Sequence, residues 1–70
     1  METKQVSKLG RKIKEFRMRR GLSQDDLARK ADVAYTTLTK IETSVIKNPS
    51  VMITAKIANA LGVSIDDLIK

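Results

Sequence analysis

Side chains able to form hydrogen bonds with another molecule are concentrated in the short segment 35–40. A threonine hydroxyl can donate or accept and its methyl can contact thymine, a lysine can reach O6 and N7 of guanine, and a tyrosine can stack or bond to a phosphate. If this segment is helical, four of these side chains share its outward face: Tyr35, Thr36, Thr39 and Lys40. They are suited to contact base edges, or they form an ordinary solvent-facing helix surface. Threonine at positions 36, 37 and 39 favours the first interpretation. Because β-branched residues lower helix propensity, a helix with a purely structural role would not need three of them.

The chain offers few side chains for enzymatic chemistry or metal binding. Its 70 residues include no cysteine and no histidine, which removes disulfides, thiolate and imidazole metal ligands, and the usual general base. It also has no glycine-rich phosphate loop and no cluster of carboxylates. We therefore predict that the chain is not an enzyme and uses neither a cofactor nor a metal ion.

The segment Ser23–Glu42 predicts two short amphipathic helices joined by a tight turn. Apolar residues line the inner faces of both helices and fill the corner between them: Leu27, Ala28, Ala31, Val33, Leu38 and Ile41. Two helices that meet at a steep angle across a short turn form a helix-turn-helix, whose second helix enters the major groove of DNA. The polar residues 35–40 lie on that second helix.

Capping and termination signals predict three further helices around this pair. Leu9, Ile13 and Phe16 recur with helical spacing, so a helix is expected over 7–20, ended at Gly21. The pair Pro49-Ser50 precedes a predicted helix over 51–61. The residue pattern at 63–68 repeats the helix start at 22–27, so it predicts a short last helix. The prediction is an all-α chain, a compact five-helix bundle with a loop at 43–48. It forms a single domain over 7–70 after a flexible polar leader at 1–6.

Positive charge is concentrated at the start of the chain. Residues 1–20 hold eight lysines and arginines against two glutamates, which accounts for the whole net charge of +6. Such a patch attracts nucleic acid because phosphate contacts release counterions, or it is a solvated face that keeps a small domain soluble. No apolar run is long enough to span a membrane and the N-terminus lacks a signal-peptide core, so we expect a cytoplasmic protein without membrane contact.

The chain resembles the λ-repressor-like DNA-binding domains of phage repressors, Cro proteins and bacterial regulators of the xenobiotic-response-element type. The resemblance covers residues 7–69 and rests on elements in family order and spacing: Leu9-Gly10, Ile13, Phe16-Arg17, Gly21-Leu22-Ser23-Gln24, Leu27-Ala28, Val33, Leu38, Ile41-Glu42, Pro49-Ser50, Ile57-Ala58, Ala60-Leu61-Gly62-Val63-Ser64 and Leu68. It implies a sequence-specific transcriptional regulator that binds a double-stranded DNA operator, with the helix around 35–42 in the major groove.

The resemblance also implies roles for individual residues. Four match base-contacting positions or stand beside them: Tyr35, Thr36, Thr39 and Lys40. Four more are implied to contact DNA phosphates: Gln24, Thr37, Lys47 and Asn48. Arg17 and Glu42 occupy the positions of a structural ion pair that ties the first helix to the end of the recognition helix. The alternatives are a plain first-turn polar residue for Gln24 and an exposed loop tip for Lys47 and Asn48.

Several positions depart from the family pattern. Asp32 stands where the family usually has glycine in the turn, and we expect it to adopt the left-handed conformation. Ala34 stands where serine or threonine usually caps the recognition helix, at a cost of about 1 kcal/mol. Thr43 and Ser44 replace the frequent glycine after Glu42, so the exit from the recognition helix is expected to be longer or tilted.

The start of the fourth predicted helix is unusually apolar. Val51, Met52 and Ile53 follow one another, and Thr54 falls where a core leucine is expected. Either the inward face is rotated, or Met52 or Ile53 is exposed to solvent. An exposed apolar spot there suits a homodimer formed through the C-terminal helices, with two recognition helices about 34 Å apart, or it is a single exposed methionine.

A second class of function fits the same fold. The apolar fourth helix and the acidic turn also suit a protein-interaction module, or an antitoxin component that binds a partner protein, with DNA binding secondary. Equal displacement of the chain from every DNA fragment by excess random DNA would favour this class over a sequence-specific regulator.

Overall fold

The computed structural model describes residues 7–70, so the leader predicted at 1–6 lies outside the described residues. Five helices follow one another in this part of the chain, and none of it forms a strand. They are α1 (Lys8–Arg19), α2 (Gln24–Ala31), α3 (Tyr35–Glu42), α4 (Val51–Leu61) and α5 (Ile65–Ile69). None of these helices is both long and apolar enough to cross a membrane. The predicted all-α class and the order of its helices are confirmed.

Serine caps define where most of the helices begin. In α1, α2, α4 and α5 a serine hydroxyl accepts a hydrogen bond from the backbone N–H three residues later: Ser7, Ser23, Ser50 and Ser64. In α2 and α5 the aspartate at that third position also accepts a hydrogen bond from the N–H of the serine. These contacts satisfy backbone groups that have no partner within the helix. α3 begins after Ala34 without a side-chain cap, as the sequence predicts.

The two capping aspartates make the fold sensitive to acid. Asp26 accepts from the backbone N–H of Ser23 at 3.2 Å, and Asp67 from that of Ser64 at 3.0 Å. These backbone hydrogen bonds, with a further contribution from the serine hydroxyls, lower the pKa of both carboxyls below the ordinary value of 3.8. A carboxyl whose pKa is lower in the folded state stabilises the fold above its unfolded pKa. That stabilisation is lost as the pH falls through the folded pKa.

Replacing both capping aspartates with asparagine is therefore expected to weaken the loss of stability in acid. The free energy of unfolding in urea is measured near neutral pH and below pH 3.8. Between these two pH values, the unchanged protein should lose more stability than the double variant Asp26→Asn/Asp67→Asn. Asp25→Asn/Asp66→Asn is the matched control, because it changes the charge equally in the same helical turns without touching a capping bond. Equal pH dependence in the two double variants contradicts the capping origin of the effect.

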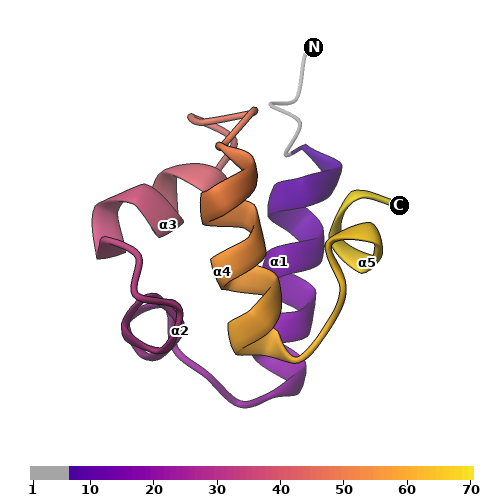
Figure 1. The fold of residues 1–70 in the computed structure, drawn as a ribbon. Helices are drawn as coiled ribbons and strands as arrows, with labels where there is room; N and C mark the ends of the chain where they lie inside the picture. The colour runs from indigo at the N-terminus through magenta and orange to yellow at the C-terminus, as the bar shows by residue number, and fades with distance from the viewer. Residues whose placement is uncertain (1–6) are drawn as a thin grey trace, which may run out of the picture.

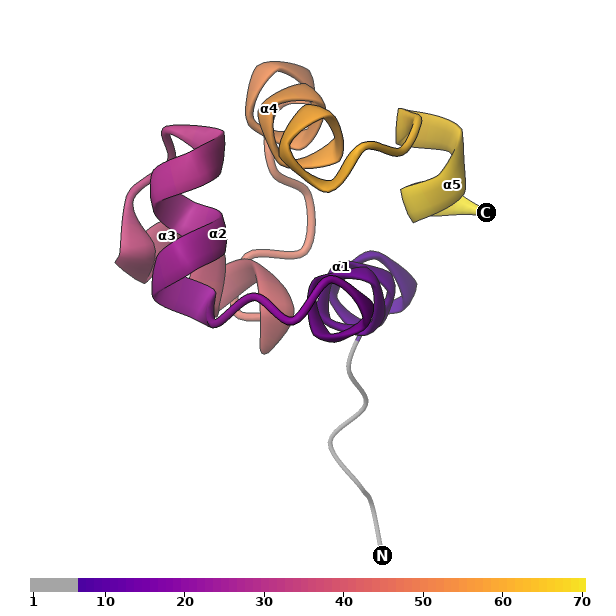
Figure 2. The same ribbon diagram turned by 90° about the horizontal axis from the view of Figure 1, so that it is seen from below.

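Every helix contributes to the hydrophobic core. Seven large side chains are fully buried: Ile13 of α1, Leu27 of α2, Leu38 and Ile41 of α3, Ile57 and Leu61 of α4, and Leu68 of α5. α1 and α4 stand in the middle, with α2 and α3 on one side and α5 on the other (Figures 1 and 2). The inner faces predicted for α2 and α3 are buried, and Val33 packs against the same core. Burying such a side chain stabilises the fold by about 1.5–3 kcal/mol, so the core holds α3 firmly by its inner face. The opposite face of α3 is left to solvent.

The turn between α2 and α3 has the predicted geometry. Asp32 adopts the left-handed conformation, with φ 59° and ψ 47°. Its backbone N–H and that of Val33 bond to carbonyl oxygens in the last turn of α2, which closes the helix end. The Asp32 carboxylate lies 3.7 Å from the ammonium of Lys56 on α4, an exposed pair that adds little stability.

The chain leaves α3 through a second left-handed residue. Ser44 has φ 68° and is buried, in the region where the family usually has glycine. Its hydroxyl oxygen accepts a hydrogen bond from the backbone N–H of Ser7, the residue that caps α1. This bond compensates for the conformation, which costs a non-glycine residue roughly 1–2 kcal/mol. It also joins the exit from α3 to the start of α1.

The structure resolves the alternatives for the start of α4. Met52 is 70% exposed, whereas Ile53 packs against the core. Thr54 points inward and is buried, and its hydroxyl donates to the carbonyl oxygen of Ser50 at 3.0 Å. Threonine can replace a core leucine here because its hydroxyl has a partner one turn earlier in the chain.

Candidate nucleic-acid interface

The outward face of α3 carries the residues predicted to contact bases. Thr36 and Lys40 are exposed, and Tyr35 is 49% accessible to solvent. Thr39 is half-buried beside them. α3 lies at the outer edge of the molecule, packed on α1 and α2 (Figure 1). Because the opposite face of the helix is in the core, the structure presents these four polar side chains together.

A hydrogen bond within α3 limits what Thr39 can contribute. Its hydroxyl donates to the backbone carbonyl oxygen of Thr36 at 2.9 Å. Since a hydroxyl has one proton, Thr39 is left to accept a hydrogen bond, for example from the exocyclic amine of adenine or cytosine. Lys40 has the opposite chemistry, because an ammonium only donates. Beside the hydroxyls of Tyr35 and Thr36, the face therefore offers a donor suited to guanine at Lys40 and an acceptor suited to an amine at Thr39.

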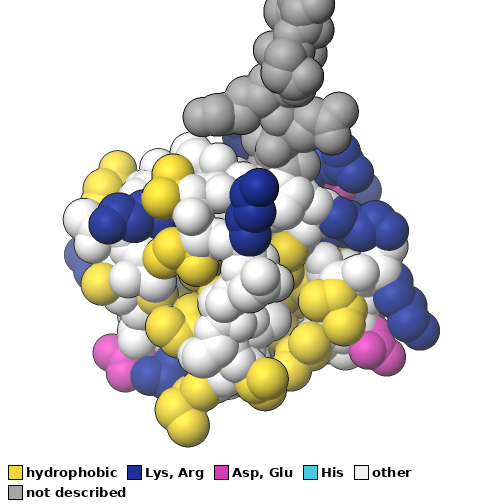
Figure 3. All heavy atoms as spheres, turned by 90° about the horizontal axis from the view of Figure 1, so that it is seen from above, with side chains coloured by type: hydrophobic (Ala, Val, Ile, Leu, Met, Phe, Trp, Pro, Cys, Tyr) yellow, Lys and Arg dark blue, Asp and Glu magenta, His cyan; other side chains and the backbone are white. Residues whose placement is uncertain are grey.

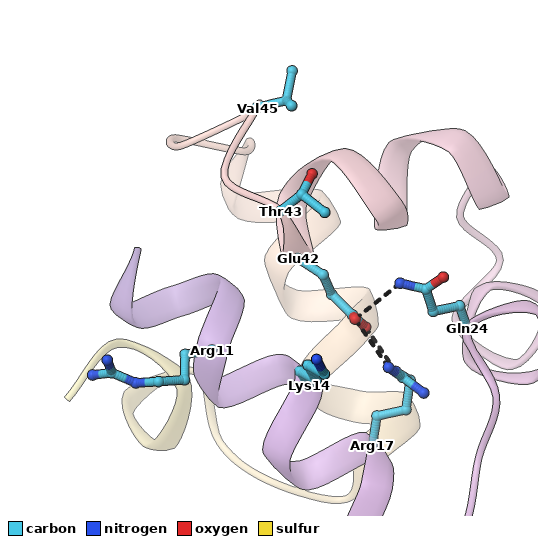
Figure 4. A pocket seen from close by; sticks show the side chains of 7 residues that line it. All are labelled: Arg11, Lys14, Arg17, Gln24, Glu42, Thr43 and Val45. Carbon is cyan, nitrogen blue, oxygen red and sulfur yellow. Dashed lines mark hydrogen bonds and ion pairs between the residues drawn. The ribbon is translucent and has the colours of Figure 1, made fainter. Parts of the chain in front are cut away.

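A buried ion pair joins α1 to the end of α3 (Figure 4). Arg17 Nε donates to Glu42 Oε2 at 2.8 Å, and Arg17 Nη2 donates to Oε1 at 3.1 Å. Arg17 Nη1 donates to the carbonyl oxygen of Leu22 at 2.9 Å. Only 11% of the Arg17 side chain and 3% of the Glu42 side chain are exposed. A bidentate pair of this kind fixes the orientation of α3 relative to α1 as well as the distance between them.

Gln24, the first residue of α2, belongs to the same network. Its Nε2 donates to Glu42 Oε1 at 3.0 Å, a contact that sequence reasoning did not anticipate (Figure 4). An amide nitrogen carries two protons, so one N–H remains for another acceptor. The predicted contact of Gln24 with a phosphate stays a prediction, and the structure adds that its amide is held in place by Glu42.

The other predicted phosphate contacts are spread along α3 and the loop after it. Thr37 is half-buried in the first turn of α3, and Lys47 and Asn48 are exposed between α3 and α4. Lys47 and Asn48 border a groove of about 250 Å³ formed with parts of α1, α4 and α5. Their roles toward DNA stay predictions.

The end of the molecule formed by the α3–α4 loop and the start of α4 exposes several hydrophobic side chains (Figure 3). They are Val45, Val51 and Met52, and Ile69 of α5 is exposed as well. Val51 and Ile69 border the same groove as Lys47. A single exposed apolar residue needs no explanation, whereas several near one another are typical of a contact surface.

Sequence reasoning missed two cationic residues beside α3. Arg11 and Lys14 of α1 line a cleft next to the end of α3, together with Arg17. The sequence places them in the basic segment 1–20 but does not show which helix meets which. Their spacing is the available signal, because residues 11, 14 and 17 recur every three positions along one side of α1.

Comparison with known proteins agrees with this geometry. The family model described as Helix-turn-helix matches residues 13–68. The HTH-type transcriptional regulator SinR of Bacillus subtilis is 38% identical over 61 residues, which make up 87% of this chain and 55% of SinR. The chain therefore spans about half the length of this relative.

Solved structures show the same likeness. The crystal structure of SinR, the master regulator for biofilm formation, in complex with DNA has a TM-score of 0.86 at 37% identity, covering 89% of this chain and 98% of that chain. The restriction–modification controller protein C.AhdI from Aeromonas hydrophila has a TM-score of 0.84 at 28% identity, covering 90% of this chain and 94% of that chain. The resemblance found in the sequence is confirmed. The chain belongs to the helix-turn-helix family.

Proposed function

We propose that this chain is a sequence-specific module that binds double-stranded DNA and regulates transcription, with α3 in the major groove. The observation that supports it best is the polar outward face of α3, held at a fixed orientation by the bidentate pair of Arg17 and Glu42. A helix inserted in a groove reads bases reproducibly only if its scaffold is rigid. The SinR structure that this chain resembles is one in complex with DNA.

Each predicted site residue has a place in this proposal. Base edges are read by Tyr35, Thr36, Thr39 and Lys40. Phosphates on either side of the groove are contacted by Gln24, Thr37, Lys47 and Asn48. Base contacts supply the choice of site, while phosphate contacts supply register and much of the affinity. We propose that the chain acts on DNA in the cytoplasm and has no catalytic role.

We further propose that two copies bind an operator together. Regulators with this motif read half-sites about 34 Å apart, one for each recognition helix. The exposed side chains of Val51, Met52 and Ile69 near the groove between α4 and α5 supply an apolar surface for self-association. A palindromic preferred site would support this arrangement.

A protein-interaction module is the second candidate function. It is favoured by the same exposed hydrophobic side chains, and one structure similar to this chain is a complex of SinR with the SinI protein. The two candidates differ in their response to competitor DNA. Excess random duplex should leave a specific complex in place, because specific sites bind roughly 10³–10⁷ times more tightly than random DNA.

The proposed function is tested by replacing Lys40, the exposed cation of α3. Preferred sites are first selected from random duplexes, and the affinities of the unchanged chain and of Lys40→Ala are then compared on the selected site and on random DNA. We expect Lys40→Ala to lose about 1–3 kcal/mol of binding energy on the selected site and much less on random DNA.

Lys70→Ala is the control, since it removes an equal charge from the end of the described chain, beyond α5. Equal losses for Lys40→Ala on both kinds of duplex would show that Lys40 reads no base. Failure to select any sequence above background would overturn the proposed function itself.

A further inference from the structure

A groove of about 250 Å³ opens at the end of the molecule where α1 and α4 begin (Figure 1). Its walls come from the starts of α1 and α4, from α5 and from the α3–α4 loop. Five of its side chains are apolar: Leu9, Pro49, Val51, Ile65 and Ile69. Leu9 and Ile65 pack against the core, while Val51 and Ile69 remain exposed. The groove is therefore an aliphatic surface that no other part of residues 7–70 covers.

The polar groups of the groove are gathered on one side. Lys47 and Asn48 both belong to the loop that precedes α4, and both are exposed. The remaining polar residue, Thr54, is buried, and its hydroxyl proton is used in the bond to the carbonyl oxygen of Ser50. A ligand in the groove thus meets hydrocarbon along the helices, and meets a cation and an amide only at the loop.

The charge of Lys47 is not balanced within the groove. None of the residues that line the groove is acidic, and Lys47 takes part in none of the ion pairs within residues 7–70. Hydrophobic and basic side chains lie side by side on this end of the molecule (Figure 3). An ammonium only donates hydrogen bonds, and it donates most strongly to a negatively charged oxygen. The combination fits a ligand with an apolar body and an anionic head.

The volume of the groove limits the length of such a ligand. A water molecule takes up about 30 Å³ in the liquid and a methylene group roughly the same, so the groove has room for about eight carbon atoms. A peptide strand fits less well, because each of its residues brings a backbone N–H and C=O that need partners. The helical walls offer no free polar side chain for them, whereas an aliphatic chain has no polar group outside its head.

We propose that this groove binds a medium-chain aliphatic carboxylate, a fatty acid of about eight carbon atoms, with its chain along α4 and α5 and its carboxylate at Lys47. The site is separate from the outward face of α3 and does not depend on the proposed function. Lys47 is the shared element, because it is also proposed to contact a DNA phosphate. Binding of the acid is therefore measured in the absence of DNA.

The test is an NMR titration of the full chain with sodium octanoate, kept below the concentration at which octanoate forms micelles. Saturable shifts are expected at the backbone amides of the residues that line the groove. In the series from butanoate through hexanoate to octanoate, each added methylene should tighten binding by up to about fourfold, because the groove removes it from water.

Variants separate the head of the ligand from its chain. Lys47→Gln should weaken octanoate several-fold and leave the affinity for octanol unchanged, since octanol has no charge. Lys30→Gln is the matched control, because it removes an equal charge from an exposed lysine of α2 outside the groove. Val51→Ser/Ile69→Ser should weaken octanoate and octanol alike, and exposed substitutions of this kind change stability little.

Four results would each overturn the proposal. Equal octanoate affinity for Lys47→Gln and Lys30→Gln would show that Lys47 does not hold the carboxylate. Shifts that fail to saturate, and that are equally large around the exposed Met18 of α1, would indicate non-specific coating of apolar surface. Groove shifts that follow protein concentration but not octanoate would assign the groove to a second copy of the chain. Groove shifts caused by an acidic, leucine-rich peptide but not by octanoate would assign it to a partner protein. The proposed function is tested on DNA with Lys40→Ala and is unaffected by any of these results.

Discussion

Gly10→Ala is expected to destabilise the protein by about 2 kcal/mol or more, although alanine is the better helix former by about 1 kcal/mol. A Cβ atom on Gly10 would lie 2.6 Å from the backbone oxygen of Ile41 and 2.9 Å from that of Glu42. Both atoms belong to the backbone at the end of α3, so no side chain can rotate away to make room. α1 and α3 would have to separate, and the core between them would open.

The measurement is the free energy of unfolding in urea, with Gly21→Ala as the control. Gly21 has φ +69° and nothing within 4 Å of an added Cβ, so its substitution carries conformational strain of roughly 1–2 kcal/mol and no clash. Gly10→Ala should also weaken DNA binding in the proposed function, because moving the end of α3 displaces Lys40. A gain in stability for Gly10→Ala would show that α1 and α3 do not meet as closely as described.

Arg17→Met is expected to cost about 3–5 kcal/mol, because it leaves the Glu42 carboxylate buried without its cation. It also removes the donor to the carbonyl oxygen of Leu22. A domain of this size has a total stability of about 4–10 kcal/mol, so the variant should lose about a third of it or more. Unfolding in urea at low temperature, followed by circular dichroism, gives the loss directly.

The double variant Arg17→Met/Glu42→Leu separates charge from packing. Replacing both partners of a buried pair by apolar residues is often neutral, so most of the lost stability should return. DNA affinity should not return with it, because the amide of Gln24 loses the acceptor that orients it. If the double variant loses as much stability as Arg17→Met and Glu42→Leu measured separately and added together, the pair is not the origin of the effect.

Local signals were sufficient to predict the helices and their ends. Ser23 and Ser64, each with an aspartate three residues later, define the starts of α2 and α5, and Asp32 takes the left-handed turn expected of it. These features depend on residues within one or two turns of each other. The same holds for the polar face of α3, which follows from the spacing of its apolar residues.

Contacts between distant residues could not be predicted in this way. The approach of Gly10 to the end of α3, the bond between Ser7 and Ser44, and the cleft beside Lys14 all depend on how helices cross. The spacing of apolar residues in a single sequence predicts each helix, but it does not predict how that helix is rotated relative to its neighbours. The start of α4 shows the limit, because an apolar run left open whether Met52 or Ile53 would face outward.

The difference between the buried and the exposed side of α3 has a consequence for how members of this family diverge. Leu38, Ile41 and Glu42 hold the helix in place, while Tyr35, Thr36 and Lys40 project to solvent away from the core. Mutations on the outer side can accumulate in duplicated copies of the gene without unfolding the product, since exposed substitutions usually change stability by only about 0.5 kcal/mol. Under the proposed function, paralogues can thereby acquire new operators one residue at a time.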